Sequence, residues 1–160
     1  SFEILDLYNM KFNPVLSEEE HYTRGGRKVS AQVIELQKKV SESDQLIFIY
    51  PVWWGSMPAI MKGFFDRVFT SGFAFKYEGK MPHGLLKGKH ALVFITSGNP
   101  VFVSKLIQGN RYSKGVANDI LKFCGLKPRV AHFGNATKFD DSKKPKIEKL
   151  VRSELSAIYE

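Results

Sequence analysis

Two adjacent tryptophans, Trp53 and Trp54, are the residues whose type and spacing first point to chemistry. They lie in the segment YPVWWGSMP (50–58), and the chain has no other tryptophan. A turn at this point offers two large aromatic faces together with free backbone N–H groups. This combination suits a planar heteroaromatic ring with polar edges. The alternative is that both side chains cover the edge of a sheet or a subunit contact.

A second candidate segment is TSGNP (96–100), which combines hydroxyl groups with the flexible Gly98. Neither segment has the GxGxxG or GxxxxGK[ST] spacing of a phosphate-binding loop. The sequence has no GxSxG nucleophile motif, and its four histidines are scattered rather than set at metal-ligand spacing. We therefore expect both segments to hold a ring by stacking and hydrogen bonding, with no metal.

Apolar patterns predict the elements that position these segments. Strands are expected over residues 2–8, 46–50, 90–96 and, more weakly, 129–133. The unbroken apolar run 46–50 is typical of a central parallel strand that is covered on both faces. Helical spacing predicts helices over 29–42 and 58–70, within 102–124 (clearest at 116–123), and at the end of the chain around 147–158. Residues 70–80, TSGFAFKYEGK, are expected to form a Gly-rich loop.

This alternation of strands and helices predicts an α/β fold: a three-layer, doubly wound parallel sheet with helices on both faces, in a single domain over residues 1–160. In such folds a ligand binds beyond the carboxyl ends of the strands. Both candidate segments follow the most apolar strands, so we expect Trp53 and Trp54 to lie at the ligand-binding edge of the sheet.

Composition limits the partners and the compartment. The net charge is +8, but the basic residues are dispersed, which favours a solvated basic surface over a nucleic-acid interface. The longest apolar segments are too short to cross a membrane. Cys124 is the only cysteine, so no internal disulfide can form. This fits a reducing compartment, and we expect a cytoplasmic protein.

Longer motifs carry a resemblance to a known family. The segment YPVWWGSMPAIMKGFFDRVFTSGFAF (50–75), supported by DLYNMKFNPVLS (6–17), TSGNP (96–100) and FCGLKP (123–128), closely resembles the NAD(P)H:quinone oxidoreductase family. This flavodoxin-like group includes DT-diaphorase and the modulator of drug activity B proteins. The resemblance implies a flavoprotein with bound FAD, or alternatively FMN. It also implies ping-pong hydride transfer from NADH or NADPH to the flavin and then to a quinone.

The resemblance also assigns roles to residues of this chain. It implies that Trp54, Phe75 and Tyr77 form the site where the quinone is reduced. It further implies a homodimer with each active site at the subunit boundary. The residues implied to bind the flavin are Pro51, Val52, Trp53, Trp54 and Gly55 along one side of the ring, and Thr96, Ser97, Gly98 and Asn99 at its pyrimidine edge.

Two departures from the family leave alternatives open. The family's first strand, its phosphate-binding loop and its first helix are not found in residues 1–160, and a form without them is expected to bind flavin weakly. No histidine follows TSGNP where some family members place one to buffer charge on the reduced flavin; Asn110 and Tyr112 are the nearest stand-ins. The alternatives are a flavoprotein regulatory subunit of a membrane transport system and a truncated, non-catalytic dimerising module.

Overall fold

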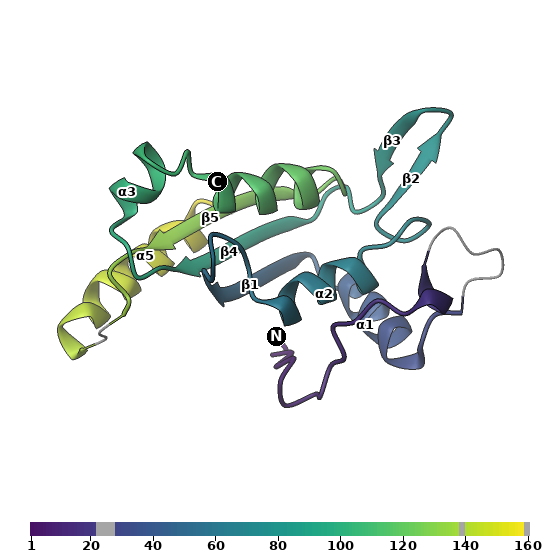
Figure 1. The fold of residues 1–160 in the computed structure, drawn as a ribbon, viewed down its shortest axis with the longest axis horizontal. Helices are drawn as coiled ribbons and strands as arrows, with labels where there is room; N and C mark the ends of the chain where they lie inside the picture. Colours follow the sequence, from purple (N-terminus) through teal and green to yellow (C-terminus); the bar gives the residue numbers. More distant parts are fainter. Residues whose placement is uncertain (22–27, 138–139, 159–160) are drawn as a thin grey trace.

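Within the residues that the structure describes, three parallel strands form the central sheet. The computed structural model describes residues 1–21, 28–137 and 140–158. The sheet has the order β1-β4-β5, with β1 spanning Gln45–Pro51, β4 His90–Thr96 and β5 Lys127–Phe133 (Figure 1). Pro51 pairs with Thr96, and Thr96 with Phe133, so all three strands end at the same edge. The predicted parallel sheet is confirmed, and its last strand begins two residues earlier than expected.

Three helical segments pack on one face of this sheet. They are α1 (Ala31–Glu42), α2 (Ala59–Val68) and η2 (Gly115–Lys122), the last with wider π-helical turns. Their apolar side chains share one core with the strand residues that face them. In this core the ring of Phe48 lies 5.0 Å from the ring of Phe65 and 6.3 Å from that of Phe64. The predicted helices over 29–42, 58–70 and 116–123 are confirmed. Pro58 is the N-cap residue that directly precedes α2.

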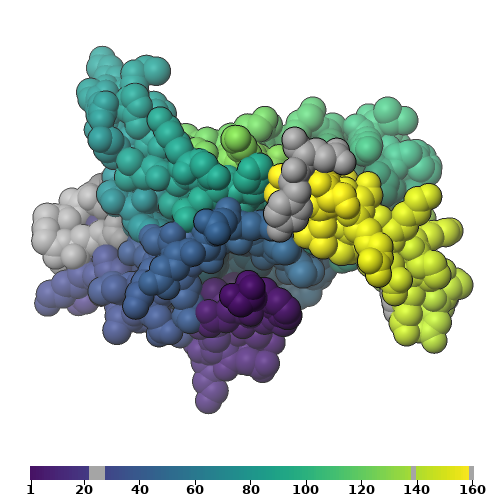
Figure 2. Space-filling model, turned by 180° about the vertical axis from the view of Figure 1, so that it is seen from behind, coloured from purple at the N-terminus to yellow at the C-terminus, as the bar shows by residue number. Residues whose placement is uncertain are grey.

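The closing helix, α5 (Lys144–Ser156), covers part of the opposite face. Leu92 and Ala131 are buried on that face, and Arg129 on β5 donates to Glu154 on α5 at 2.9 Å. The sheet therefore has helices on both faces, as predicted. From behind, α5 (yellow) crosses one part of the molecule and leaves the blue segment around β1 visible beside it (Figure 2).

Strand β1 is less covered than its sequence suggests. The prediction of a central strand covered on both faces is wrong within the described residues, because β1 is an outer strand of the sheet. Ile47 and Ile49 are 48% and 70% exposed. Their neighbours Phe48 and Tyr50 point to the other face and are buried. An unbroken apolar run indicates a strand, but it does not reveal whether a helix lies over each face.

The predicted strand over residues 2–8 is also wrong. Residues 1–6 have no regular structure and are followed by a turn at residues 7–11. The carboxylate of Asp6 accepts hydrogen bonds from the backbone N–H groups of Tyr8 (3.0 Å) and Asn9 (3.1 Å). A side chain that satisfies these donors competes with strand pairing. Leu7 and Phe12 still bury their side chains in the core.

A hairpin replaces the loop that was predicted for residues 70–80. Its strands are β2 (Phe75–Glu78) and β3 (Met81–Gly84), which pair antiparallel. Gly79 opens the two-residue turn at φ +62, a conformation that a side chain disfavours. The hairpin stands clear of the central sheet at the end opposite the arrowheads (Figure 1). The glycines therefore mark a tight turn between short strands rather than an irregular loop.

Short helical segments complete the described chain. They are η1 (Glu18–Glu20), α3 (Val101–Leu106), α4 (Arg111–Lys114) and η3 (Asp141–Lys143). One buried ion pair ties η1 to α2: the guanidinium of Arg67 donates to both carboxylate oxygens of Glu20, at 2.6 and 2.7 Å. Arg67 also donates to the carbonyl of Asn13. This bidentate pair holds α2, and with it the turn that precedes α2, against the N-terminal segment.

Candidate functional site

Three loops meet where the central strands end. They follow Pro51 of β1, Thr96 of β4 and Phe133 of β5, which are aligned by the strand register. The N–H of Val52 donates to the carbonyl of Thr96 at 2.7 Å, and the N–H of Ser97 donates to that of Phe133 at 3.0 Å. The sheet ladder thus continues one residue into two of the loops. Both predicted ligand-binding segments therefore lie side by side at one edge.

Trp54 occupies a strained turn and is fully exposed. Trp53 and Ser56 exchange two backbone hydrogen bonds of 2.9 Å, and Trp54 and Gly55 between them have φ values of +51 and +72. Positive φ at both central positions defines a type I′ turn. An aromatic residue in the left-handed region costs on the order of 1 kcal/mol, and such strain concentrates at functional sites. The relative exposure of Trp54 is 105%, against 55% for Trp53. The turn thus presents the Trp54 ring to solvent.

The turn also presents hydrogen-bond donors. Among the described residues, no partner is found for the N–H groups of Trp54 and Gly55, nor for those of Gly98 and Asn99 on the neighbouring loop. Gly98 and Asn99 are exposed. An exposed indole and free amide donors from two adjacent loops fit a planar ring with polar edges. They offer contacts to its face and to its edge.

Ser97 has a different position from its neighbours. It is buried, its hydroxyl donates to the carbonyl of Asn99 at 2.9 Å, and its Oγ lies 2.7 Å from Nε2 of His132. Its N–H is bonded to Phe133. The donors of Ser97 are therefore used within the chain, and they shape the turn rather than point out of it.

Sequence reasoning missed two residues behind this turn. His132, near the end of β5, bonds Ser97, although in the sequence it looks like one of four scattered histidines. Gly134 packs against the turn so closely that an added β-carbon would lie 2.7 Å from the Asn99 carbonyl oxygen. Strand register was the available signal for His132. His132 lies one residue before the end of β5, and the parallel register places it beside the end of β4, where the 97–99 turn begins. Nothing in the sequence marked Gly134 as a contact.

The stand-ins Asn110 and Tyr112 lie close to this region. Tyr112 is buried and places its ring edge against His132, with centroids 5.6 Å apart, while its hydroxyl donates to Ser104. Asn110 has a left-handed backbone and precedes α4. Next to it, Arg111 places its Nε 3.9 Å from where a β-carbon of Gly55 would lie. An exposed cation therefore stands beside the tryptophan turn.

Phe75 and Tyr77 are not brought to Trp54 within one chain. The chain passes from the tryptophan turn along α2 to the hairpin, and the hairpin then leads into the first residue of β4. The Phe75 ring lies 4.9 Å from that of Phe123, just before β5 begins. The hairpin is thus at the amino ends of the strands (Figure 1). A strand of seven residues separates the two ends by about 20 Å.

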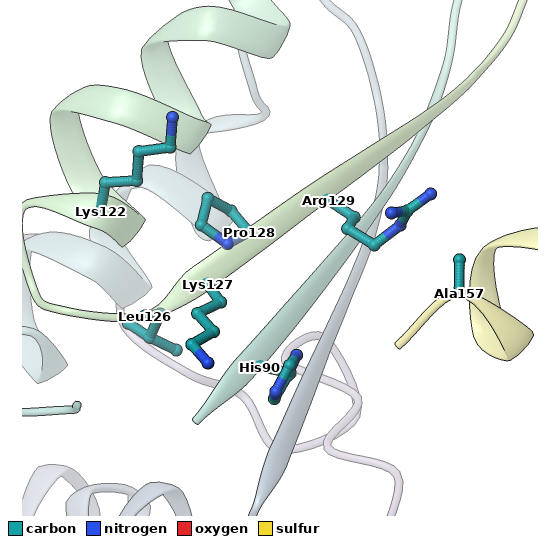
Figure 3. A pocket seen from close by; sticks show the side chains of 7 residues that line it. All are labelled: His90, Lys122, Leu126, Lys127, Pro128, Arg129 and Ala157. Atoms are coloured by element: carbon teal, nitrogen blue, oxygen red, sulfur yellow. The ribbon is translucent and has the colours of Figure 1, made fainter. Parts of the chain in front are cut away.

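A shallow hollow of about 400 Å³ also lies away from these loops. It is lined by His90, Lys122, Leu126, Lys127, Pro128, Arg129 and Ala157 (Figure 3). His90 and Lys127 begin their strands, so this hollow is at the amino end of the sheet. None of the predicted site residues lines it. Its lysines are exposed to solvent and Arg129 is paired with Glu154. The hollow therefore has no buried polar side chain that is free to bind a ligand.

Other kinds of site find little support in the described chain. It contains no group of three or more His, Cys, Asp or Glu side chains placed to hold a metal ion. Cys124 is buried, and burial raises the pKa of its thiol to about 12, so it is a poor nucleophile. Within the same residues, no helix has the length and apolar character needed to span a membrane.

Comparisons with known proteins agree with the strand topology. The family model described as a flavodoxin-like fold matches residues 1–156. A protein of Haemophilus influenzae named as an uncharacterized NAD(P)H oxidoreductase is 32% identical over 154 residues, which cover 95% of this chain and 76% of that protein. The guinea-pig (Cavia porcellus) NAD(P)H dehydrogenase [quinone] 1 is 33% identical over 81% of this chain, but the match spans only 56% of that enzyme.

A solved structure gives the same result in three dimensions. The NAD(P)H:quinone oxidoreductase of Methanothermobacter marburgensis superposes with a TM-score of 0.79 at 29% identity, over 94% of this chain and 76% of that structure. The family model covers nearly the whole chain, and the relatives match in both sequence and fold. The chain therefore belongs to the flavodoxin-like fold family, with relatives named as NAD(P)H oxidoreductases and NAD(P)H dehydrogenases [quinone].

Proposed function

We propose that this protein is a flavin-dependent NAD(P)H:quinone oxidoreductase that works by ping-pong hydride transfer. The observation that carries the proposal is the fully exposed Trp54 in its left-handed turn, beside free amide donors at the carboxyl ends of parallel strands. This is the edge at which open α/β sheets bind their ligands. The names of the relatives indicate the electron donor and the acceptor.

The proposed flavin is FAD, with FMN as the alternative. Its ring would lie along the turn after β1, in contact with Trp54 and with the segment formed by Pro51, Val52, Trp53 and Gly55. Thr96, Gly98 and Asn99 would meet its polar edge, where the N–H groups of Gly98 and Asn99 are free to donate. Ser97 would contribute indirectly, because its hydroxyl bonds the carbonyl of Asn99 and so shapes the turn that carries these donors.

The bound flavin would supply the redox chemistry, since it accepts a hydride from NAD(P)H and passes it to a quinone. The residues of this chain orient the reactants and stabilise charge. The Trp54 ring provides a stacking surface that holds a flat molecule and excludes water. Free N–H donors at the ring edge stabilise negative charge as it develops, and Arg111 adds a cation beside the turn.

Phe75 and Tyr77 are proposed to complete the site of a second copy of the chain. Tyr77 is 58% exposed on a hairpin at the far end of the sheet from Trp54. In a two-fold symmetric dimer each hairpin can reach the carboxyl edge of its partner, which would place an active site at each end of the interface. The cytoplasmic location and the absence of a nucleic-acid partner remain predictions from composition.

Flavin titration tests this proposal. FAD and FMN are added to the wild type, to Trp54→Ala and to Phe2→Ala, and the quenching of flavin fluorescence is followed. Phe2 is a matched control, an aromatic side chain with 89% exposure beside Glu3, which pairs with Lys39 near the end of α1. Loss of one stacking surface should weaken binding about tenfold or more for Trp54→Ala. Equal affinities in all three proteins would contradict the assignment.

A further inference from the structure

His132 lies behind the ligand-facing turn rather than on it. It is the last residue but one of β5, and its register partner on β4 is Ile95. Its Nε2 atom is 2.7 Å from Oγ of Ser97, and Ser97 in turn bonds the carbonyl of Asn99. The imidazole is therefore one side chain away from the turn that carries the free N–H groups of Gly98 and Asn99.

The acceptors around Ser97 fix the position of the imidazole proton. A carbonyl oxygen can only accept, so the single hydroxyl proton of Ser97 is donated to Asn99. The hydroxyl cannot also donate to His132, and Nε2 must therefore carry a proton and donate it to Ser97 Oγ. In the neutral ring, Nδ1 then holds a lone pair. Nδ1 is buried and has no hydrogen-bond partner in the described part of the chain.

The surroundings of His132 favour this neutral form. The groups that face it are Lys105 from α3, Tyr112 from α4 and Ser97 directly after β4. None of these three carries a negative charge near neutral pH. Burial, and then the charge of Lys105, hold the pKa of His132 below its ordinary value of 6.5. Near neutral pH, negative charge that arrives nearby therefore favours a proton at Nδ1.

We propose that His132 is a positioning residue that couples the charge on a ligand at the 97–99 turn to the geometry of that turn, through its hydrogen bond to Ser97. This inference rests on the proposed flavin site. His132 takes up one proton from water at Nδ1 when hydride transfer from NAD(P)H places negative charge at the turn. It returns that proton to water when the charge leaves, as the quinone is reduced by the hydride and one proton from water.

The first test needs no flavin. The signals of the His132 ring and the amides of Gly98 and Asn99 are followed by NMR against pH in the wild type, His132→Gln and His132→Leu. The glutamine amide can donate to Ser97 as Nε2 does but does not titrate. In the wild type both amides should shift with the midpoint of His132, below 6.5. His132→Gln should keep their neutral-pH positions without the step, and His132→Leu should displace them. A step that persists in His132→Gln, or amides unmoved in His132→Leu, would overturn the inference.

The second test adds FMN or FAD, oxidised and then reduced. Reduced flavin should raise the His132 midpoint in the wild type, and the affinity ratio of the two flavin forms should depend on pH less in His132→Gln. An unchanged midpoint with bound reduced flavin contradicts the proton uptake. A wild type that binds neither flavin contradicts the proposed function instead, and the flavin-free titration still decides whether His132 controls the turn.

Discussion

Gly134 packs so closely against the backbone of Asn99 that a β-carbon on Gly134 would lie 2.7 Å from the Asn99 carbonyl oxygen. The same β-carbon would lie 2.7 Å from the nitrogen of Val101. Real β-carbons essentially never come so close to backbone atoms. The loop after β5 therefore holds the loop after β4 in place, and the free amides of Gly98 and Asn99 owe their positions to a glycine one strand away.

The substitution Gly134→Ala should displace the 98–101 turn. The added methyl group meets backbone atoms, which cannot rotate away, so we expect a loss of about 1–3 kcal/mol in the free energy of unfolding. Flavin affinity should fall with it. Chemical denaturation and flavin titration measure the two effects. Gly115→Ala is the matched control, because its β-carbon meets nothing closer than 3.9 Å and it lies in a helix. Equal behaviour of both variants would contradict the contact.

The buried ion pair between Glu20 and Arg67 should be far more sensitive than a surface pair. Replacing Arg67 by Met leaves the Glu20 carboxylate buried without its partner, which costs about 3–5 kcal/mol in the free energy of unfolding. Asp66 lies next to Arg67 on α2 but pairs with the exposed Lys62. Asp66→Asn should therefore cost less than about 1 kcal/mol. Urea denaturation measures the free energy of unfolding of both variants. Similar losses would contradict a larger contribution from the buried pair.

Acid should weaken the same pair. Hydrogen bonds from the Arg67 guanidinium hold the pKa of Glu20 below its ordinary value of 4.5. A lowered pKa in the folded state contributes stability that is complete above 4.5 and is lost as the pH falls below 4.5 through the folded-state pKa. The free energy of unfolding of the wild type should therefore fall over this range. Glu20→Gln should be less stable at neutral pH but should lose less on acidification; a parallel loss in both proteins would argue against a role for Glu20.

The proposed dimer predicts that two defective chains can restore one active site. In a mixed dimer of Trp54→Ala and Tyr77→Ala, one site carries both changes and the other carries neither. Random mixing should then recover about a quarter of wild-type activity, because half the dimers are mixed and each has one intact site. The measurement is quinone reduction after the two variants are unfolded and refolded together. No recovery above the separate variants would contradict a site shared between Trp54 of one chain and Tyr77 of its partner.

The sequence was sufficient for the parts of the fold that periodicity encodes. The helix over 29–42 and the strand over 90–96 were predicted because their apolar positions follow one face or an unbroken run. The placement of Trp54 could be predicted because it directly follows a parallel strand, and the loop after such a strand lies at the carboxyl edge of the sheet. That residues 1–160 form a single domain remains a prediction.

The failures have separate physical causes. Residues 2–8 join no sheet in the described chain, and the Asp6 side chain accepts hydrogen bonds from the N–H groups of Tyr8 and Asn9 where the predicted strand would end. The cover expected over Ile49 depends on which elements pack there, and local sequence does not specify this. His132 and Gly134 act through contacts between strand ends that are distant in sequence. Phe75 and Tyr77 were assigned to the quinone site by resemblance alone, and only the topology reveals that they lie at the far end of the sheet from Trp54.

The measurement that tests the central claim most directly is the visible spectrum of the chain mixed with FAD or FMN and freed of unbound flavin, recorded without oxygen. We expect a yellow protein that is bleached by NADH or NADPH and regains its colour when a quinone is added. Trp54→Ala should retain less flavin, and Phe2→Ala should behave as the wild type. A wild type that stays colourless with both flavins, or one whose flavin no nicotinamide reduces, would contradict the proposed function.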